Sequence, residues 1–212
     1  MTSRKDTDAE RAALAHLKKT EPRLHAAAQR HRGAILSRVK PKRTNAALFV
    51  SLAGSIVSQQ LSLKAAASIF ARVEETLGGT VTPDAILAVP PARLRRAGLS
   101  DSKVRSLREL AEAVATGELN LLALKRVPPE EAVIRLSALY GIGPWTAEMF
   151  LIFALGAPDI FSPGDLILVK QMQKHLSLDG ASRKELAAHA ERWSPHRSYV
   201  SLLLWKLSHE DD

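Results

Sequence analysis

The chain has 212 residues, which is enough for one or two small domains with a substantial core. Lysine and arginine number 30 against 22 acidic residues, and the resulting net charge of +8 favours an anionic partner such as nucleic acid. The absence of cysteine excludes structural disulfides, thiolate zinc sites and cysteine-ligated iron–sulfur clusters.

Apolar residues recur at helical spacing along almost the whole chain, whereas the alternation typical of strands is nearly absent. The predicted helices span Asp8–Lys19, Glu21–Arg38, Ala46–Ser58, Leu63–Leu77, two short segments opened by Pro83 and by Pro90-Pro91, Ser102–Thr116, Pro128–Tyr140, Trp145–Leu155, Arg183–Trp193 and Tyr199–Leu207. The one β-branched run, Leu166–Val169, has no partner strand, so we assign it to a helix as well. The predicted fold class is therefore all-α.

No apolar run reaches the roughly 20 residues of a membrane span. The first residues also lack the apolar core of a signal peptide. We therefore expect no membrane partner and an intracellular protein, which in a bacterium would be cytoplasmic and associated with the nucleoid.

The most specific feature is the string Leu136-Ser-Ala-Leu-Tyr140-Gly-Ile-Gly-Pro-Trp145-Thr-Ala-Glu-Met-Phe150. Gly141 and Gly143 flank one apolar residue, Ile142, between two amphipathic helices, and Pro144 stands where the second helix would begin. Gly-x-Gly alone also suits an ordinary tight turn. The longer arrangement presents backbone N–H groups and a helix N-terminus outward, which suits a phosphate.

This string resembles the helix-hairpin-helix of the DNA glycosylase superfamily. The resemblance implies that the hairpin, Leu139–Ala147, grips DNA phosphates, and that the backbone carbonyls of Ser137, Leu139 and Ile142 can hold Na⁺ or K⁺. The segment Ile56–Ser62 resembles the family loop that fills the hole left by a flipped base, with Gln59 or Gln60 as the wedge. The DNA-binding residues expected on this basis are Gln59, Gln60, Gly141, Ile142, Gly143, Thr146 and Lys170.

Downstream of the hairpin, Phe161-Ser-Pro-Gly-Asp165 reads as a Pro-Gly turn with an aspartate that caps the next helix. The resemblance implies that Asp165 is also the catalytic carboxylate. Some alkylpurine relatives carry two adjacent acids here, but Gly164 replaces the first. A fixed anion beside the sugar stabilises the positive charge that builds up when an N-glycosidic bond breaks, and it can orient or deprotonate the attacking water.

Three further observations indicate the branch of the superfamily to which the chain is similar. Superfamily members that also cut the strand carry a lysine two residues after the second glycine, where this chain has Trp145, so we expect a monofunctional enzyme. Ala97–Lys103 resembles a family turn before a helix, and Trp193–Trp205 resembles the C-terminal segment of the alkylpurine group. From roughly Ala46 to Trp205 the chain resembles the 3-methyladenine DNA glycosylase II branch, in a short form without its N-terminal β-containing domain.

The resemblance places Trp145, Trp205, Met149 and Leu166 in the base pocket. Indoles attract a cationic alkylated base through cation–π interactions. Met149 and Leu166 stand where other relatives have tyrosines, so this pocket is expected to be less aromatic. The preferred lesion stays open among 3-methyladenine, 7-methylguanine, 1-methyladenine, 3-methylcytosine, hypoxanthine and ethenoadenine.

The expected organisation is two helical subdomains with an active-site cleft between them. One comprises residues 1–45 and 166–212, and the other is residues 46–165, with the helix-hairpin-helix at 130–155. We expect a monomer that binds double-stranded DNA containing alkylated bases and requires no cofactor. Three alternatives remain open: a non-catalytic DNA-binding module, a uracil or mismatch glycosylase, and a basic scaffold for protein partners.

Overall fold

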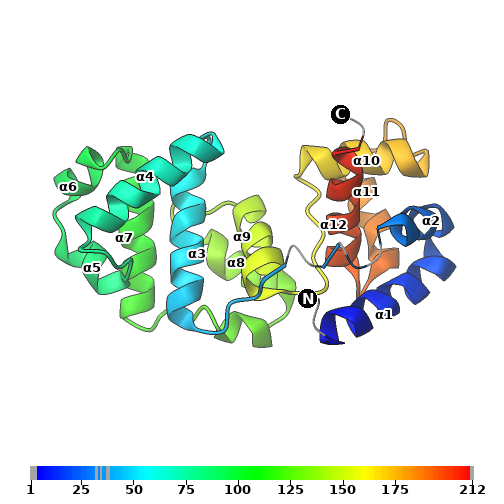
Figure 1. The fold of residues 1–212 in the computed structure, drawn as a ribbon, viewed down its shortest axis with the longest axis horizontal. Helices are drawn as coiled ribbons and strands as arrows, with labels where there is room; N and C mark the ends of the chain where they lie inside the picture. The colour runs from blue at the N-terminus through cyan, green and yellow to red at the C-terminus, as the bar shows by residue number, and fades with distance from the viewer. Residues whose placement is uncertain (1–3, 32, 34, 37–38, 211–212) are drawn as a thin grey trace. The chain divides into compact units, whose positions relative to one another are not determined.

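The computed structural model describes residues 4–31, 33, 35–36 and 39–210. Their regular structure is entirely helical (Figure 1), which confirms the all-α prediction. No helix in these ranges has the length and apolar character that a membrane crossing requires.

The chain divides into two compact units, which we describe separately. Unit 1 contains residues 1–40 and 151–212, and unit 2 contains residues 41–150. The boundaries expected from the sequence were 45/46 and 165/166. The second observed boundary lies earlier, at 150/151, and Phe153 after it stacks on Trp205 of the same unit.

Unit 1 is built around its last helix, α12. Its elements are α1 (Arg4–Thr20), α2 (Pro22–Arg30), the π-helical turn η3 (Leu151–Leu155), α10 (Leu166–Leu176), α11 (Arg183–Ala190), the 3₁₀ turn η4 (Glu191–Trp193) and α12 (Arg197–Ser208). Helix α12, red in Figure 1, packs against α10, while α1 packs against α2 and η4. Val200, Leu203 and Leu204 of α12 and the indole of Trp193 are completely buried, so they form the core of this unit.

Unit 2 is built around α3 (Asn45–Ser58), which contacts α4, α7 and α9. The other elements are α4 (Leu63–Thr76), α5 (Pro83–Ala88), α6 (Pro91–Arg96), α7 (Asp101–Ala115), the 3₁₀ turn η2 (Ala123–Arg126), α8 (Pro129–Ser137) and α9 (Pro144–Phe150). Helix α3 is apolar around most of its circumference, and its side chains at Leu48, Phe49, Leu52 and Ile56 are buried. A helix of that composition takes the central position because it has little polar surface to offer water.

Helix starts follow from local chemistry. The hydroxyls of Thr44, Ser62, Thr82 and Ser100 each accept a hydrogen bond from a backbone N–H in the first turn of α3, α4, α5 and α7. Proline occupies the first turn of α5, α6 and α8, where its missing N–H removes no helical hydrogen bond. The predicted boundaries of these helices therefore lie close to the observed ones.

Four predicted helices end differently. The helix predicted over Pro128–Tyr140 ends at Ser137, and the helix predicted over Arg183–Trp193 ends at Ala190, where a 3₁₀ turn follows. Helix α2 ends at Arg30 instead of Arg38, because the Gly33 N–H donates to the carboxylate of Glu10 at 2.9 and 3.0 Å and Gly33 takes φ +77°. Residues 32, 34 and 37–38 of the predicted segment lie outside the described residues. The predicted helix Trp145–Leu155 changes from α to π geometry at Leu151, where the chain passes from unit 2 to unit 1.

Candidate functional site

In unit 1, Asp165 lies at the start of α10 and is 7% exposed. The turn before it closes through a hydrogen bond from Asp165 N–H to the Ser162 carbonyl at 3.2 Å, with Pro163 and Gly164 at its corner. Its Oδ1 accepts hydrogen bonds from the N–H groups of Ile167 and Leu168, both at 3.0 Å. The predicted capping role is therefore confirmed, and the positive end of the α10 dipole favours the negative charge of the carboxylate.

Trp205 holds the same carboxylate from α12. Its indole Nε1–H donates to Asp165 Oδ1 at 3.2 Å. Behind it, Phe153 of η3 stacks on the indole with ring centroids 5.6 Å apart and planes 27° from parallel. Three N–H donors thus converge on one carboxylate oxygen, and Trp205 is itself fixed by an aromatic neighbour. Phe153 could not be predicted as part of this arrangement, because a single phenylalanine in an apolar helix carries no signal of its stacking partner.

The segment that leads to Asp165 is fastened to the start of α12. Asp159 accepts hydrogen bonds from Arg197 Nε at 2.8 Å and from Ser194 Oγ at 2.7 Å. Burial raises the pKa of the Asp159 carboxyl, but the Arg197 and Ser194 hydrogen bonds and the Arg197 charge outweigh it and hold that pKa below its usual value. Ser198 adds two bonds, donating to the Ala157 carbonyl and accepting from the Ile160 N–H. The C-terminal segment Trp193–Trp205 therefore holds in place the residues that precede Asp165 in the chain.

In unit 2, the hairpin between α8 and α9 has the two glycines in different roles. Gly141 takes φ +78°, and a Cβ at this position would lie 2.1 Å from the Ser106 Oγ of α7. Gly143 does not take a positive φ, and a Cβ there would meet open space. Its carbonyl accepts the Ala147 N–H at 3.0 Å, so α9 begins directly after it. Ile142 is 3% exposed, so the apolar residue between the two glycines is buried.

Helix α7 supports the hairpin loop. The Tyr140 N–H donates to Glu109 Oε1 at 2.7 Å, and the Arg105 guanidinium lies 3.8 Å from the centroid of the Tyr140 ring. The close approach of Gly141 to Ser106 is the third contact with the same helix. The loop is therefore fixed from one side by consecutive turns of α7.

The predicted wedge loop lies beside the hairpin within unit 2. The Gln59 side chain donates to the Gly141 carbonyl at 3.0 Å and to Thr146 Oγ1 at 3.3 Å, so it is engaged in holding the hairpin. Gln60 is exposed and has the left-handed φ of +58°. Lys103, which the sequence placed only in a turn before a helix, donates from Nζ to the carbonyls of Val57 at 2.7 Å and Gln59 at 2.8 Å.

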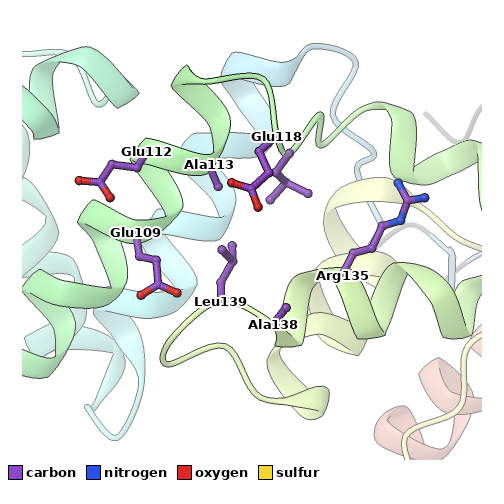
Figure 2. A pocket seen from close by; sticks show the side chains of 8 residues that line it. Glu109, Glu112, Ala113, Glu118, Arg135, Ala138 and Leu139 are labelled. Atoms are coloured by element: carbon purple, nitrogen blue, oxygen red, sulfur yellow. The ribbon is translucent and has the colours of Figure 1, made fainter.

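A pocket of about 460 Å³ lies between α7 and α8 (Figure 2). Glu109, Glu112 and Glu118 line it together with Arg135, so it carries three carboxylates against one guanidinium. This negative lining repels phosphate, which excludes the pocket as a seat for the DNA backbone. Of the predicted site residues, only Leu139 lines it.

The remaining predicted site residues are distributed over both units. Trp145 and Met149 belong to unit 2, with Trp145 50% exposed and Met149 partly buried. Leu166 and Lys170 follow Asp165 on α10 in unit 1, and both are exposed. The structure therefore brings Asp165 and Trp205 together in one unit, and Gln59, the hairpin and Thr146 together in the other.

Comparison with known proteins identifies the family. Residues 53–196 match the family described as HhH-GPD superfamily base excision DNA repair protein. DNA-3-methyladenine glycosylase 1 of Schizosaccharomyces pombe is 32% identical over 165 residues, which cover 76% of this chain and 72% of that protein. DNA-3-methyladenine glycosylase 2 of Escherichia coli is 32% identical over 161 residues, covering 71% and 54%. The chain thus spans little more than half the length of some curated relatives.

Two solved structures are similar to this chain in both fold and sequence. The DNA-3-methyladenine glycosidase of Bacillus halodurans has a TM-score of 0.74 and 33% identity, with 88% of each chain covered. The 3-methyladenine DNA glycosylase of Schizosaccharomyces pombe in complex with abasic DNA has a TM-score of 0.74 and 28% identity, covering 93% of this chain and 97% of that one. The chain therefore belongs to the HhH-GPD superfamily of base excision DNA repair proteins, in the DNA-3-methyladenine glycosylase branch.

Proposed function

We propose that this protein excises alkylated bases from double-stranded DNA by hydrolysing the N-glycosidic bond. The observation that carries the proposal is Asp165, a nearly buried carboxylate held by three N–H donors and located downstream of a helix-hairpin-helix. The names of the relatives in this branch support alkylated bases as the substrate class.

Asp165 acts as the fixed anion in this mechanism. Positive charge develops on the sugar as the glycosidic bond breaks, and the carboxylate stabilises it without reorganising, because its donors already hold it in place. At about 4 Å and an effective dielectric near 20, two unit charges interact by roughly 4 kcal/mol. The same carboxylate orients the water that attacks the sugar. An alkylated cationic base leaves readily, so little acid catalysis is required.

The hairpin supplies the grip on the DNA backbone. The open space beside Gly143 lets a phosphate approach the first amides of α9, while Gly141 and Ile142 hold the loop in shape. The loop carbonyls fit a monovalent cation, because they are neutral oxygen donors, and Leu139 O, which accepts the Ile142 N–H, has a second lone pair. The carbonyls of Ser137, Leu139 and Ile142 would hold Na⁺ or K⁺ there, and the ion would add positive charge toward the phosphate.

Gln60 is the wedge in this proposal. Gln59 is engaged by the hairpin, whereas Gln60 projects from the loop and is exposed. A flipped nucleotide leaves a hole in the base stack, and an amide side chain can fill it and hydrogen-bond to the base opposite.

The base is recognised by Trp145 and Trp205, whose ring faces suit an electron-poor base. The side chains of Met149 and Leu166 are apolar and offer no hydrogen bonds, which favours alkylated bases over uracil because uracil is recognised by hydrogen bonds. Trp145 also stands at the position of the lyase lysine, so no amine is available for a Schiff base and the product is an intact abasic strand. Lys170, exposed on α10, adds a positive charge for a phosphate.

The test is to incubate the purified protein with duplexes that each carry one of the six candidate lesions and to identify the released base. We expect release of an alkylated base, with strand breakage only after heat or alkali. Binding without release from any duplex would favour the non-catalytic DNA-binding module. Release of uracil alone would favour the uracil glycosylase, and strand breakage without heat or alkali would contradict the monofunctional assignment.

A further inference from the structure

We infer that Lys103 is a positioning residue for base flipping: its ammonium holds the loop from which Gln60 projects. This inference rests on the proposed function, since it gives the loop of residues 59–62 a role on damaged DNA. We call these four residues the wedge loop.

Lys103 binds the carbonyls from which the wedge loop departs. Its Nζ donates to Val57 O at 2.7 Å and to Gln59 O at 2.8 Å, where α3 has ended. The last carbonyls of a helix have no hydrogen-bond donor within the helix. Many helices end with a glycine in the left-handed conformation, which lets the following backbone N–H groups donate to these carbonyls. Here Gln60 takes a positive φ of +58°, a backbone conformation that is unfavourable for a residue with a Cβ. An external donor is therefore needed to hold the loop in this shape.

The position of Lys103 on α7 is unfavourable for a lysine that has no other partner. It lies in the first turn of α7, directly after Asp101 and Ser102, where the positive end of the helix dipole disfavours a cation. Burial also lowers the pKa of its ammonium. The carbonyls at the negative end of α3 compensate for both effects, which indicates that the lysine is placed to bind them.

Helix α7 holds the hairpin as well as the wedge loop. About one turn beyond Lys103, Ser106 lies against Gly141, and about two turns beyond it Glu109 accepts the Tyr140 N–H. Gln59 joins the two parts directly through its bonds to Gly141 and Thr146. Lys103 therefore sets where the wedge loop lies relative to the hairpin that grips the phosphates.

This role predicts a dependence on base pairing. Flipping a paired base requires unstacking and unpairing, and the free-energy cost is lower for a mismatched base. A misplaced wedge should therefore slow excision more when the lesion is properly paired. Loss of a residue that acts on the chemical step would slow both substrates by the same factor.

The experiment measures single-turnover excision of one lesion that the wild-type protein removes, in a duplex where it is paired and in one where it is mismatched. Lys103→Met keeps the apolar stem and removes the donors, and Lys103→Arg restores donors and charge. Lys64→Met is the matched control, because Lys64 is an exposed lysine on α4 just beyond the wedge loop. Fluorescence of 2-aminopurine placed next to the lesion reports flipping separately from bond cleavage.

We expect Lys103→Met to slow excision of the paired lesion about tenfold more than that of the mismatched lesion, equivalent to about 1.4 kcal/mol. Lys103→Arg should recover most of this ratio, and Lys64→Met should leave it at the wild-type value. Both duplexes meet the same protein preparation, so partial unfolding lowers both rates equally and cannot produce the ratio.

An unchanged ratio in Lys103→Met, with an active wild type, would overturn this inference and leave the proposed function intact. A wild-type protein that excises no lesion would contradict the proposed function and the inference with it.

Discussion

The Asp165 carboxylate is held by groups that are far apart in the sequence. Two backbone N–H groups of α10 follow it directly, and the third donor, Trp205, comes from α12. Phe153 in turn stacks on the Trp205 indole. In the proposed function Trp205 therefore combines two roles, since its ring would stack on the base and its N–H orients the Asp165 carboxylate.

Replacing Trp205 with phenylalanine separates these roles. Phenylalanine keeps an aromatic ring but loses the N–H, and a hydrogen bond to a charged group contributes about 1.5–3 kcal/mol. We expect kcat to fall at least about tenfold with KM little changed, and by the same factor for cationic 7-methylguanine and neutral hypoxanthine. A loss confined to the cationic base would show that Trp205 acts through stacking alone.

At the residue scale the sequence predicts what is local. The Pro-Gly turn predicts Asp165 as a helix cap, and the family resemblance, through the spacing after the hairpin, implies its catalytic role. The partners of Trp205 and the acceptors of Lys103 could not be predicted, because they lie about 40 residues away in the sequence and no periodicity links them.

In unit 2, α7 supports both the wedge loop and the hairpin. It contacts the wedge loop through Lys103 and the hairpin through Ser106 and Glu109. The amphipathic pattern predicted this helix and its buried face, because Val104, Leu107, Leu110 and Ala111 repeat at helical spacing. Its polar contacts could not be predicted in the same way, because a hydrogen bond depends on the packing of neighbouring elements.

The two hairpin glycines should respond differently to alanine. Gly141→Ala would force a Cβ into a positive φ and within 2.1 Å of the Ser106 Oγ, which is buried and donates to the Ser102 carbonyl. We expect a loss of at least about 2 kcal/mol in the free energy of unfolding, measured by urea denaturation.

Gly143→Ala is the matched variant, because a Cβ there meets open space at an ordinary φ. It should unfold like the wild type while binding duplex DNA less tightly, since the methyl group occupies the space for the phosphate. Equal destabilisation by both substitutions would contradict the assignment of separate roles.

At the scale of the whole chain, the sequence predicted two helical subdomains, and the structure contains two compact units. The segment that joins α9 to Asp165 is fastened within unit 1 by Asp159, Arg197 and Ser198. That network holds the segment that leads to Asp165 against the first residues of α12.

This network should make stability depend on pH. The pKa of Asp159 is lower in the folded protein than in the unfolded chain, so the unfolded chain binds protons more readily in acid. Its contribution is fully present above the unfolded pKa, near 3.9, and is lost as the pH falls through the folded value. Asp159→Asn should therefore cost about 1–3 kcal/mol at pH 7, and the difference from the wild type should shrink below about pH 4 in urea denaturation. A difference that is constant from pH 7 to pH 3 would contradict this account.

In the proposed function Asp165 acts on the glycosidic bond, while the hairpin between α8 and α9 binds the DNA backbone. The most direct test of this proposal is base release from methylated DNA by the Asp165→Asn variant, compared with the wild type, together with the affinity of both for a duplex. Asparagine keeps an oxygen that can accept the capping hydrogen bonds but carries no charge, so we expect release to fall by at least about 10³-fold while duplex binding persists. Wild-type release by Asp165→Asn would contradict the mechanism.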